Sequence, residues 1–192
     1  MTQLLPLPTP VPLFDDPLDN LIQANIVNIT GLPASMVRPR FQPEPASHPE
    51  YNVNWCAFGI ASYDNDAFAA NTFNPTGNGG AGSMTVERDE LITINLSFYG
   101  PNNYQYISAY REGIVLDFNR FDLYAANTNL VSVGQIVNLP ALLKDKWVKR
   151  LDTKVVFRRR VSRTYGVVSL IGNTVTLITD TGLTTTINTQ QP

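Results

Sequence analysis

Basic side chains gather in one short part of this 192-residue chain. The segment 144–163 holds nine of the fourteen lysines and arginines. Four of them, Arg150, Lys154, Arg158 and Arg160, share one parity, so an extended strand would place them on one face. Guanidinium and ammonium groups presented in this way bind carboxylates or phosphates, and otherwise they form a solvated face.

The net charge of −2 conceals a strong division of charge along the chain. The segment 144–163 contains nine basic and two acidic residues, which gives it a charge of +7. Residues 1–143 contain five basic and thirteen acidic residues, a charge of −8, and Asp180 is the remaining acid. The near-neutral total argues against a basic nucleic-acid binder, and the division indicates a polarised molecule.

The residues that usually perform catalysis or hold metals are scarce. Cys56 lies in the apolar run 55–58, and His48 lies in a proline-rich stretch that is typical of an exposed loop. One cysteine and one histidine exclude the common four-ligand zinc sites and an intrachain disulfide. The glycine-rich segment 77–82 lacks the lysine and the hydroxyl of a phosphate-binding loop. We therefore predict no catalytic residues, no cofactor, no metal and no enzymatic activity.

The basic face needs a long strand to present it. Trp147–Tyr165 alternates between apolar and polar residues with period two, which predicts one strand; Arg159 and Arg163 interrupt its apolar parity. Further strands are expected at Val53–Tyr63, Thr85–Tyr99 and Leu130–Leu139. The polar segment Asp64–Ser83 between the first two is predicted to be a long loop, to which we assign no role.

Two helical regions are expected beside these strands. Asp16 is predicted to cap a helix with Pro17 at its first position, and Gly31 ends it. A second region begins at Pro101 and ends, after a break near Asn119, at Ala126. The predicted fold is α+β, an antiparallel sheet with about two helices on one face. We expect a proline-rich extended arm at 1–14, a domain at 15–170 and a C-terminal β-hairpin at 171–192.

Four sequence strings, in this order, carry a family resemblance. They are GLPASMVRPRFQPEP at 31–45, WCAFGI at 55–60, SFYGPN at 97–102 leading to YREG at 110–113, and WVKRLD at 147–152 leading to RRRVSRTY at 158–165. Together they resemble the phage neck-terminator (tail-terminator-like) proteins over about residues 17–170. The arm and the last twenty residues lie outside this resemblance.

The resemblance implies a structural virion protein of the neck or tail, assembled in the host cytoplasm. Such proteins form a homo-oligomeric ring, usually a hexamer, at the head-proximal end of the tail tube. The ring stops tube growth and contacts the tail tube protein and a head-completion or connector protein. Genomic DNA passes through without specific binding. The family brings no catalytic residues, and no membrane partner or signal peptide is expected.

The basic residues then become candidates for contacts between subunits. The candidates are Arg150, Lys154, Arg158, Arg160, Arg163, Arg38 and Arg40. We favour pairing with acidic groups of a neighbouring subunit, since head-to-tail rings join two different surfaces. A DNA-lining face and a merely solvated face remain the alternatives. For Arg38 and Arg40, a salt bridge within the chain to Glu44 or to the acidic run 87–90 is preferred.

Other function classes remain open at this stage. A head-completion or connector protein is the nearest alternative within the same class. A nucleic-acid-binding accessory protein would use the basic strand and bind DNA with a steep salt dependence. The chain lacks the platform of interleaved basic and aromatic residues that single-strand binders use, so this function is less favoured.

Overall fold

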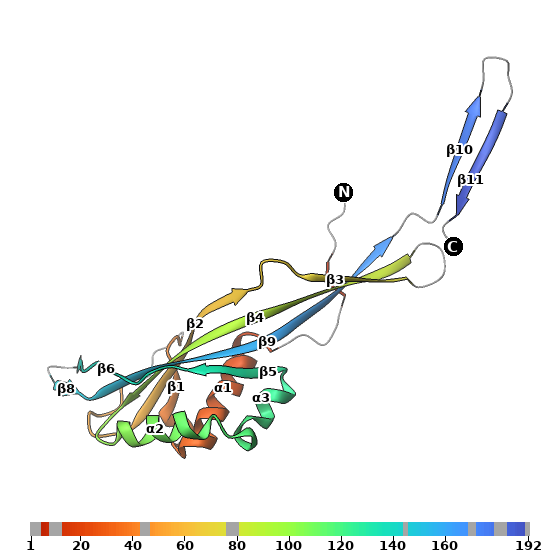
Figure 1. Cartoon of the computed structure of the whole chain (residues 1–192). Coiled ribbons are helices and arrows are strands. Elements are labelled where there is room, and N and C mark those ends of the chain that lie inside the picture. Colours follow the sequence, from red (N-terminus) through yellow and green to blue (C-terminus); the bar gives the residue numbers. More distant parts are fainter. Residues whose placement is uncertain are drawn as a thin grey trace. The chain divides into compact units, whose positions relative to one another are not determined.

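A computed structural model describes residues 5–7, 13–42, 47–75, 81–143, 146–168, 172–178 and 184–190 (Figure 1). The chain divides into two compact units whose segments interleave along the sequence. The larger unit comprises Pro12–Phe68 and Arg88–Val161. The smaller unit comprises Met1–Val11, Ala69–Glu87 and Ser162–Pro192.

Helix α1 (Asp15–Thr30) opens the larger unit. Leu18, Ile22 and Ile26 follow one another at intervals of four residues and are almost fully buried, as the helical spacing predicts. The predicted cap is wrong: the helix begins at Asp15, and the N-cap residue Phe14 makes no side-chain capping hydrogen bond. Asp16 instead lies within the first turn, where the helix dipole favours its charge. Gly31 ends the helix in the left-handed conformation (φ 71°), as predicted.

The sheet of the described residues runs in the order β1-β2-β4-β9-β5, and β6 also pairs with β9. Its strands are β1 (Val37–Pro39), β2 (Trp55–Asn65), β4 (Ala81–Tyr99), β9 (Arg150–Val168), β5 (Thr128–Val133) and β6 (Val137–Asn138). β1 pairs with β2 in parallel, whereas β2 with β4 and β5 with β9 are antiparallel. A separate small ladder joins β7 (Ala141–Leu143) to β8 (Lys146–Val148).

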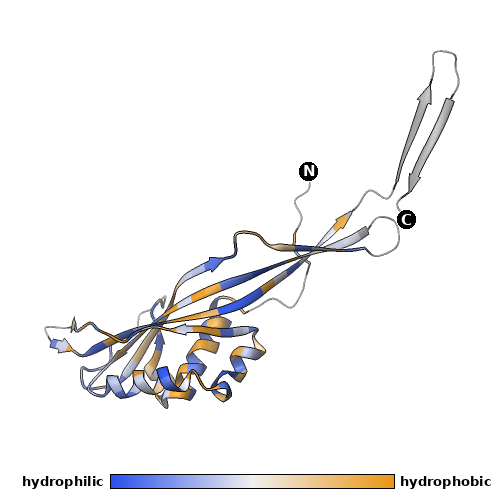
Figure 2. Ribbon diagram, in the orientation of Figure 1, coloured by the Kyte–Doolittle hydropathy of each residue, from blue (hydrophilic) through white to orange (hydrophobic). Residues whose placement is uncertain are grey.

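The predicted strands at 53–63 and 85–99 are present, whereas those at 130–139 and 147–165 are each divided into two strands, β5 with β6 and β8 with β9. Hydrophobic and hydrophilic residues alternate along β4 and β9 in Figure 2, which is the period that predicted them. Gly134 separates β5 from β6, and Lys149 separates β8 from β9. The short strand β1 was not predicted, because its three residues, one of them Pro39, are too few to show a period.

The helices of the larger unit lie on one face of its sheet (Figure 1). They are α1, α2 (Asn103–Gly113) and α3 (Phe121–Ala125), with 3₁₀ turns η1 (Ala34–Met36) and η2 (Asp117–Arg120). The core between the two layers is apolar and close to fully buried. Its main members are Ile26, Phe58, Ile94, Phe98, Ile107, Tyr110, Val155 and Phe157. The α+β prediction is confirmed.

The smaller unit is built from strand pairs. β3 (Ala70–Pro75) pairs antiparallel with the first part of β4, from Ala70 opposite Glu87 to Pro75 opposite Gly82. The prediction of a loop throughout 64–83 is therefore wrong for β3 and also at its two ends, where β2 continues to Asn65 and β4 begins at Ala81. Residues 76–80 lie outside the described ones. All six residues of β3 are exposed, so no burial pattern could reveal the strand.

The two ends of the chain contribute extended segments to the smaller unit. Pro6 forms a β-bridge with Tyr165, and the amide of Leu7 donates to the carbonyl of Thr164 at 2.7 Å. β10 (Gly172–Ile178) and β11 (Thr184–Gln190) form the predicted antiparallel hairpin. The rest of the predicted arm at 1–4 and 8–12, and of the hairpin at 171, 179–183 and 191–192, lies outside the described residues. No described helix has the length and apolarity needed to cross a membrane.

Candidate functional site

The sheet face of the larger unit that faces away from the helices carries the predicted basic residues. Lys154, Arg158 and Arg160 are exposed on β9, and Arg150 is half-buried at its start. Residues of the other parity, among them Val155 and Phe157, are buried in the core. The alternation therefore sorts the basic and the apolar side chains of β9 as the sequence predicts.

Two of these arginines share a single carboxylate within the chain. Asp89 on β4 forms an ion pair with Arg158, and its Oδ1 accepts from Nε of Arg160 at 3.3 Å. The hydrogen bond from Arg158, followed by that from Arg160, lowers the pKa of Asp89. This group of three keeps one net positive charge, so the face is less basic than its sequence indicates.

Arg150 also has a partner of its own. Its Nε and Nη2 donate to the two carboxylate oxygens of Asp152 at 2.8 and 2.6 Å. The guanidinium lies 5.7 Å from the centre of the Tyr99 ring. The hydrogen bonds to Asp152 raise the pKa of Arg150 and hold its planar group in one orientation.

Arg38 and Arg40 make hydrogen bonds to neutral groups. Arg38 donates from Nε to the Ser35 carbonyl at 2.9 Å and from Nη1 to the Ser47 carbonyl at 3.0 Å. Arg40 donates from Nη2 to the Ser97 hydroxyl at 2.5 Å. Among the described residues neither arginine pairs with a carboxylate, so the predicted salt bridge to the run 87–90 is wrong. Glu44 lies outside the described residues.

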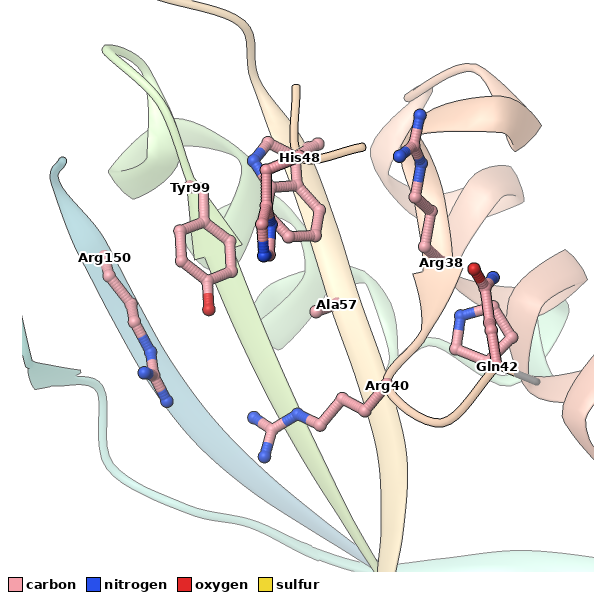
Figure 3. Close-up of a pocket in the computed structure, with 9 residues that line it drawn as sticks. Arg38, Arg40, Gln42, His48, Ala57, Tyr99 and Arg150 are labelled. Atoms are coloured by element: carbon pink, nitrogen blue, oxygen red, sulfur yellow. The ribbon is translucent and has the colours of Figure 1, made fainter. Parts of the chain in front are cut away.

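Arg38, Arg40 and Arg150 line one hollow of about 340 Å³, called here the arginine hollow, and the guanidinium group of Arg38 points away from the other two (Figure 3). The other lining residues are Pro39, Gln42, His48, Trp55, Ala57 and Tyr99. The rings of Trp55 and Tyr99 stack with centroids 4.2 Å apart and planes 7° apart, and His48 lies against Trp55. Figure 3 shows the guanidinium groups of Arg40 and Arg150 extending toward one another from different segments.

A glycine lets Arg40 lie across β2. A Cβ atom at Gly59 would stand 3.2 Å from the Cβ of Arg40 and 3.3 Å from its Cδ. Glycine inside a strand often marks such a close approach, and its absence of a side chain leaves room for the arginine stem. The shape of the arginine hollow thus depends on a residue that the sequence analysis did not single out.

The remaining candidates are distributed differently. Lys154 lines an adjacent hollow of about 390 Å³ that also includes Arg40 and Asp152. Arg163 belongs to the smaller unit, where it is exposed. The structure therefore assembles Arg38, Arg40 and Arg150 into one site and Arg158 and Arg160 into another.

Arg159, which interrupts the apolar parity of β9, is a buried structural residue. Its Nε donates to Oε2 of Glu90 at 2.6 Å, its Nη1 donates to the Leu13 carbonyl, and its guanidinium lies 4.6 Å from the Phe14 ring centre. The sequence showed the irregularity of Arg159 but not its partner Glu90, which lies on β4.

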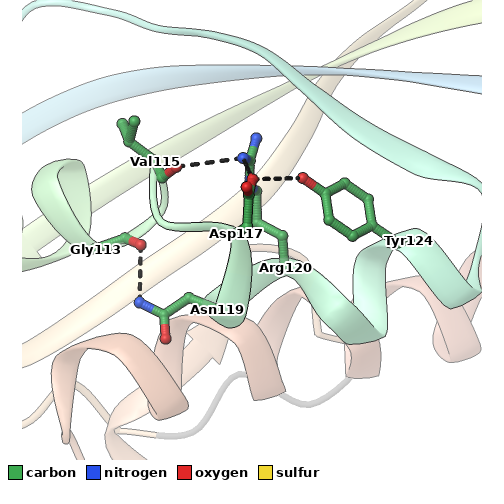
Figure 4. A network of polar contacts seen from close by, with 6 residues as sticks. All are labelled: Gly113, Val115, Asp117, Asn119, Arg120 and Tyr124. Atoms are coloured by element: carbon green, nitrogen blue, oxygen red, sulfur yellow. Dashed lines mark hydrogen bonds and ion pairs between the residues drawn. The ribbon is translucent and has the colours of Figure 1, made fainter.

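A second surface, on the helical side, was missed by the sequence analysis. Phe118 and Phe121 are exposed and touch edge to face, with centroids 5.7 Å apart. Polar contacts hold the same segment (Figure 4): Asp117 accepts from Arg120 and Tyr124, and Asn119 donates to the Gly113 carbonyl at 2.8 Å. These contacts hold the segment between α2 and α3 in a defined conformation.

The two residues considered for catalysis lie apart from any reactive arrangement in the described structure. Cys56 is fully buried, and burial raises the pKa of its thiol, so it stays protonated. His48 contacts Trp55 at the arginine hollow. No group of three metal-binding side chains occurs among the residues that the structure describes.

Comparison with known families identifies the class of protein. The model of the phage neck terminator protein family matches residues 16–189, which is nearly the whole chain. The chain belongs to this family of structural proteins of the phage neck, and the resemblance noted in the sequence is confirmed. The match extends to residue 189, so the C-terminal hairpin, which was predicted to lie outside the resemblance, belongs to the matched region. Membership implies a place in the virion, and the family is not an enzyme family. No curated protein sequence matches the chain.

Proposed function

We propose that the protein forms a ring at the head-proximal end of a phage tail tube, terminates tube growth and joins the tail to the head-completion or connector protein. The observation that carries this proposal is the family match over residues 16–189, which includes both basic sites of the larger unit. A ring of six copies is the expected form.

The charge distribution supports assembly from identical subunits. Closed rings form when two different surfaces of one subunit complement each other, and opposite charges favour and orient such contacts. Arg38 and Arg40 retain charges that no described carboxylate neutralises, while residues 1–143 are strongly acidic. One copy thus carries both halves of a complementary pair.

Passage of DNA without specific binding is consistent with the neutralisation around Asp89. A conduit that held phosphates tightly would slow the genome, because each phosphate contact adds to affinity. Asp89 reduces the positive charge of Arg158 and Arg160 at the exposed face. This observation favours a passage or contact role over a nucleic-acid-binding accessory protein.

The arm 1–14 and the hairpin 171–192 are proposed to contact the tail tube protein or the neighbouring neck protein. An isolated two-stranded hairpin is marginal in water, so β10 and β11 would gain stability from a partner. The segment 15–170 would then supply the body of the ring. Assembly is expected in the host cytoplasm before the virion is complete.

A phage with this gene deleted tests the proposal and separates it from its nearest alternative. Loss of a terminator leaves tubes that grow beyond their normal length and carry no heads in electron micrographs of lysates. Loss of a head-completion or connector protein instead leaves tails of normal length beside unattached heads. Normal-length tails in the deletion lysate would therefore contradict the terminator function.

A further inference from the structure

We propose that the arginine hollow is a socket that receives an acidic side chain of a second copy of this chain. The inference rests on the ring proposed above and assigns one of its two contact surfaces. The incoming carboxylate would lie between the guanidinium groups of Arg40 and Arg150, against the stacked rings of Trp55 and Tyr99.

The composition of the hollow is that of a protein-binding hot spot. Tryptophan, tyrosine and arginine are the residues that most often dominate the energy of protein interfaces, in concave sites that exclude water. Trp55, Tyr99 and three arginines line this hollow, and its volume of about 340 Å³ suits one or two side chains. A planar guanidinium also recognises a carboxylate through two parallel hydrogen bonds.

The charge of the hollow is incompletely balanced. Three arginines line it, and the carboxylate that pairs with them in the described structure is Asp152, which is bound to Arg150. The hydrogen-bond partners of Arg38 and Arg40 are carbonyls and a hydroxyl, which carry no net charge. Among the described residues the site therefore retains an excess positive charge, which an incoming carboxylate would neutralise.

The arginines are held before any partner arrives. Arg38 is fixed by two backbone carbonyls, Arg40 by Ser97 and by the space at Gly59, and Arg150 by Asp152. Fixing these long side chains in advance reduces the entropy lost on binding. Such pre-organisation is expected of a binding site and is unnecessary for a solvated face.

A second copy is the occupant that the charge distribution favours. Among the described carboxylates, those in ion pairs are Asp89, Glu90, Asp117 and Asp152. The other described acidic side chains make no ion pair with a described residue, so each copy offers carboxylates to its neighbour. A DNA duplex fits less well, because its evenly spaced phosphates are bound by basic residues spread along an extended surface, whereas these arginines gather at one hollow.

Charge reversal tests the socket. The double variant Arg38→Glu/Arg40→Glu is compared with Arg88→Glu/Arg111→Glu, which makes the same charge change at two exposed arginines outside the hollow. We expect the hollow variant to remain monomeric by light scattering at concentrations where the wild type and the control assemble. Far-ultraviolet circular dichroism of each variant verifies that it is folded.

A milder variant and a mixing experiment complete the test. Arg40→Gln removes the charge without reversing it, and we expect it to raise the concentration needed for half-assembly by roughly thirtyfold or more. The hollow variant keeps its acidic surface, so adding it to wild type should cap growing assemblies and reduce the yield of rings. The control variant should join rings without reducing their yield.

The outcomes separate this inference from the ring itself. Full assembly of the hollow variant beside an assembled wild type overturns the socket alone. Unimpaired assembly together with loss of duplex DNA binding would assign the hollow to DNA instead, and would also overturn it. A wild type that remains monomeric at every concentration overturns the ring, and the socket with it.

Discussion

Replacing Glu90 with glutamine is expected to destabilise the larger unit by about 3–5 kcal/mol, because the change leaves a buried guanidinium without its counter-charge. The side chain of Arg159 is 1% exposed and that of Glu90 is 10% exposed. Water therefore cannot take over the role of the missing carboxylate at this site.

The surroundings of Arg159 offer little compensation for that loss. Its remaining contacts are the Leu13 carbonyl and the Phe14 ring, which are neutral. Its Nη2 atom is buried and has no hydrogen-bond partner in the described structure. The expected cost thus lies in the range for breaking a buried pair rather than an exposed one, which contributes about 1 kcal/mol or less.

Thermal unfolding followed by circular dichroism measures the effect. For a chain of this size, about 1 kcal/mol shifts the melting temperature by roughly 2–4 °C, so Glu90→Gln should lower it by roughly 6–20 °C. Asp117→Asn is the matched control, since it also converts a carboxylate in an ion pair to an amide. The side chain of Asp117 is 77% exposed, so its loss should cost about 1 kcal/mol or less.

A double variant distinguishes an ion pair from simple packing. Arg159→Met/Glu90→Leu removes both charges, and we expect it to be more stable than Glu90→Gln alone. A stability loss for Glu90→Gln no greater than that of the Asp117→Asn control would contradict a buried ion pair here, as would a double variant that is no more stable than Glu90→Gln.

Three further predictions concern separate parts of the larger unit. The Cys56 thiol should not react with a thiol reagent until the protein unfolds, because burial keeps it protonated and inaccessible; rapid native labelling would contradict this. Ile107→Ala should cost about 2–5 kcal/mol in denaturant unfolding, since the side chain is fully buried between α2 and the sheet, and a loss under about 1 kcal/mol would argue against this core. The pKa of Asp89 is lowered on folding, so its ion pairs stabilise the protein fully at pH values above the ordinary pKa of 3.8. That stabilisation is lost as the pH falls through the lowered pKa. Asp89→Asn should therefore lose a small amount of stability near pH 6 and less at pH 2, as melting temperatures at the two values would show.

Regular patterns made much of the fold predictable from the sequence. The four-residue spacing of Leu18, Ile22 and Ile26 defines the buried face of α1, and period-two alternation defines β4 and β9. The exposed strand β3 and the three-residue strand β1 carry no such pattern, because pairing with neighbouring strands holds them in place. The residues of such a strand do not reveal it by themselves, because the partner strand that holds it lies elsewhere in the sequence.

The sequence predicted the arginines of the candidate site but not how they are arranged. Arg40 and Arg150 lie far apart in the sequence and meet only because β1, β2, β4 and β9 are neighbours in the sheet. The intramolecular partner of Arg158 was missed, since an acidic residue on β4 can be matched with one on β9 only when the register is known. The stacked rings of Trp55 and Tyr99, which also line the arginine hollow, were missed for the same reason.

The mass and symmetry of the purified protein test the central proposal most directly. Light scattering combined with electron-microscopic class averages should show a species near six times 21.3 kDa, with rotational symmetry and a central hole. A protein that stays at 21.3 kDa at high concentration, with no ring in any class average, would contradict the proposal that it closes a phage tail as a ring.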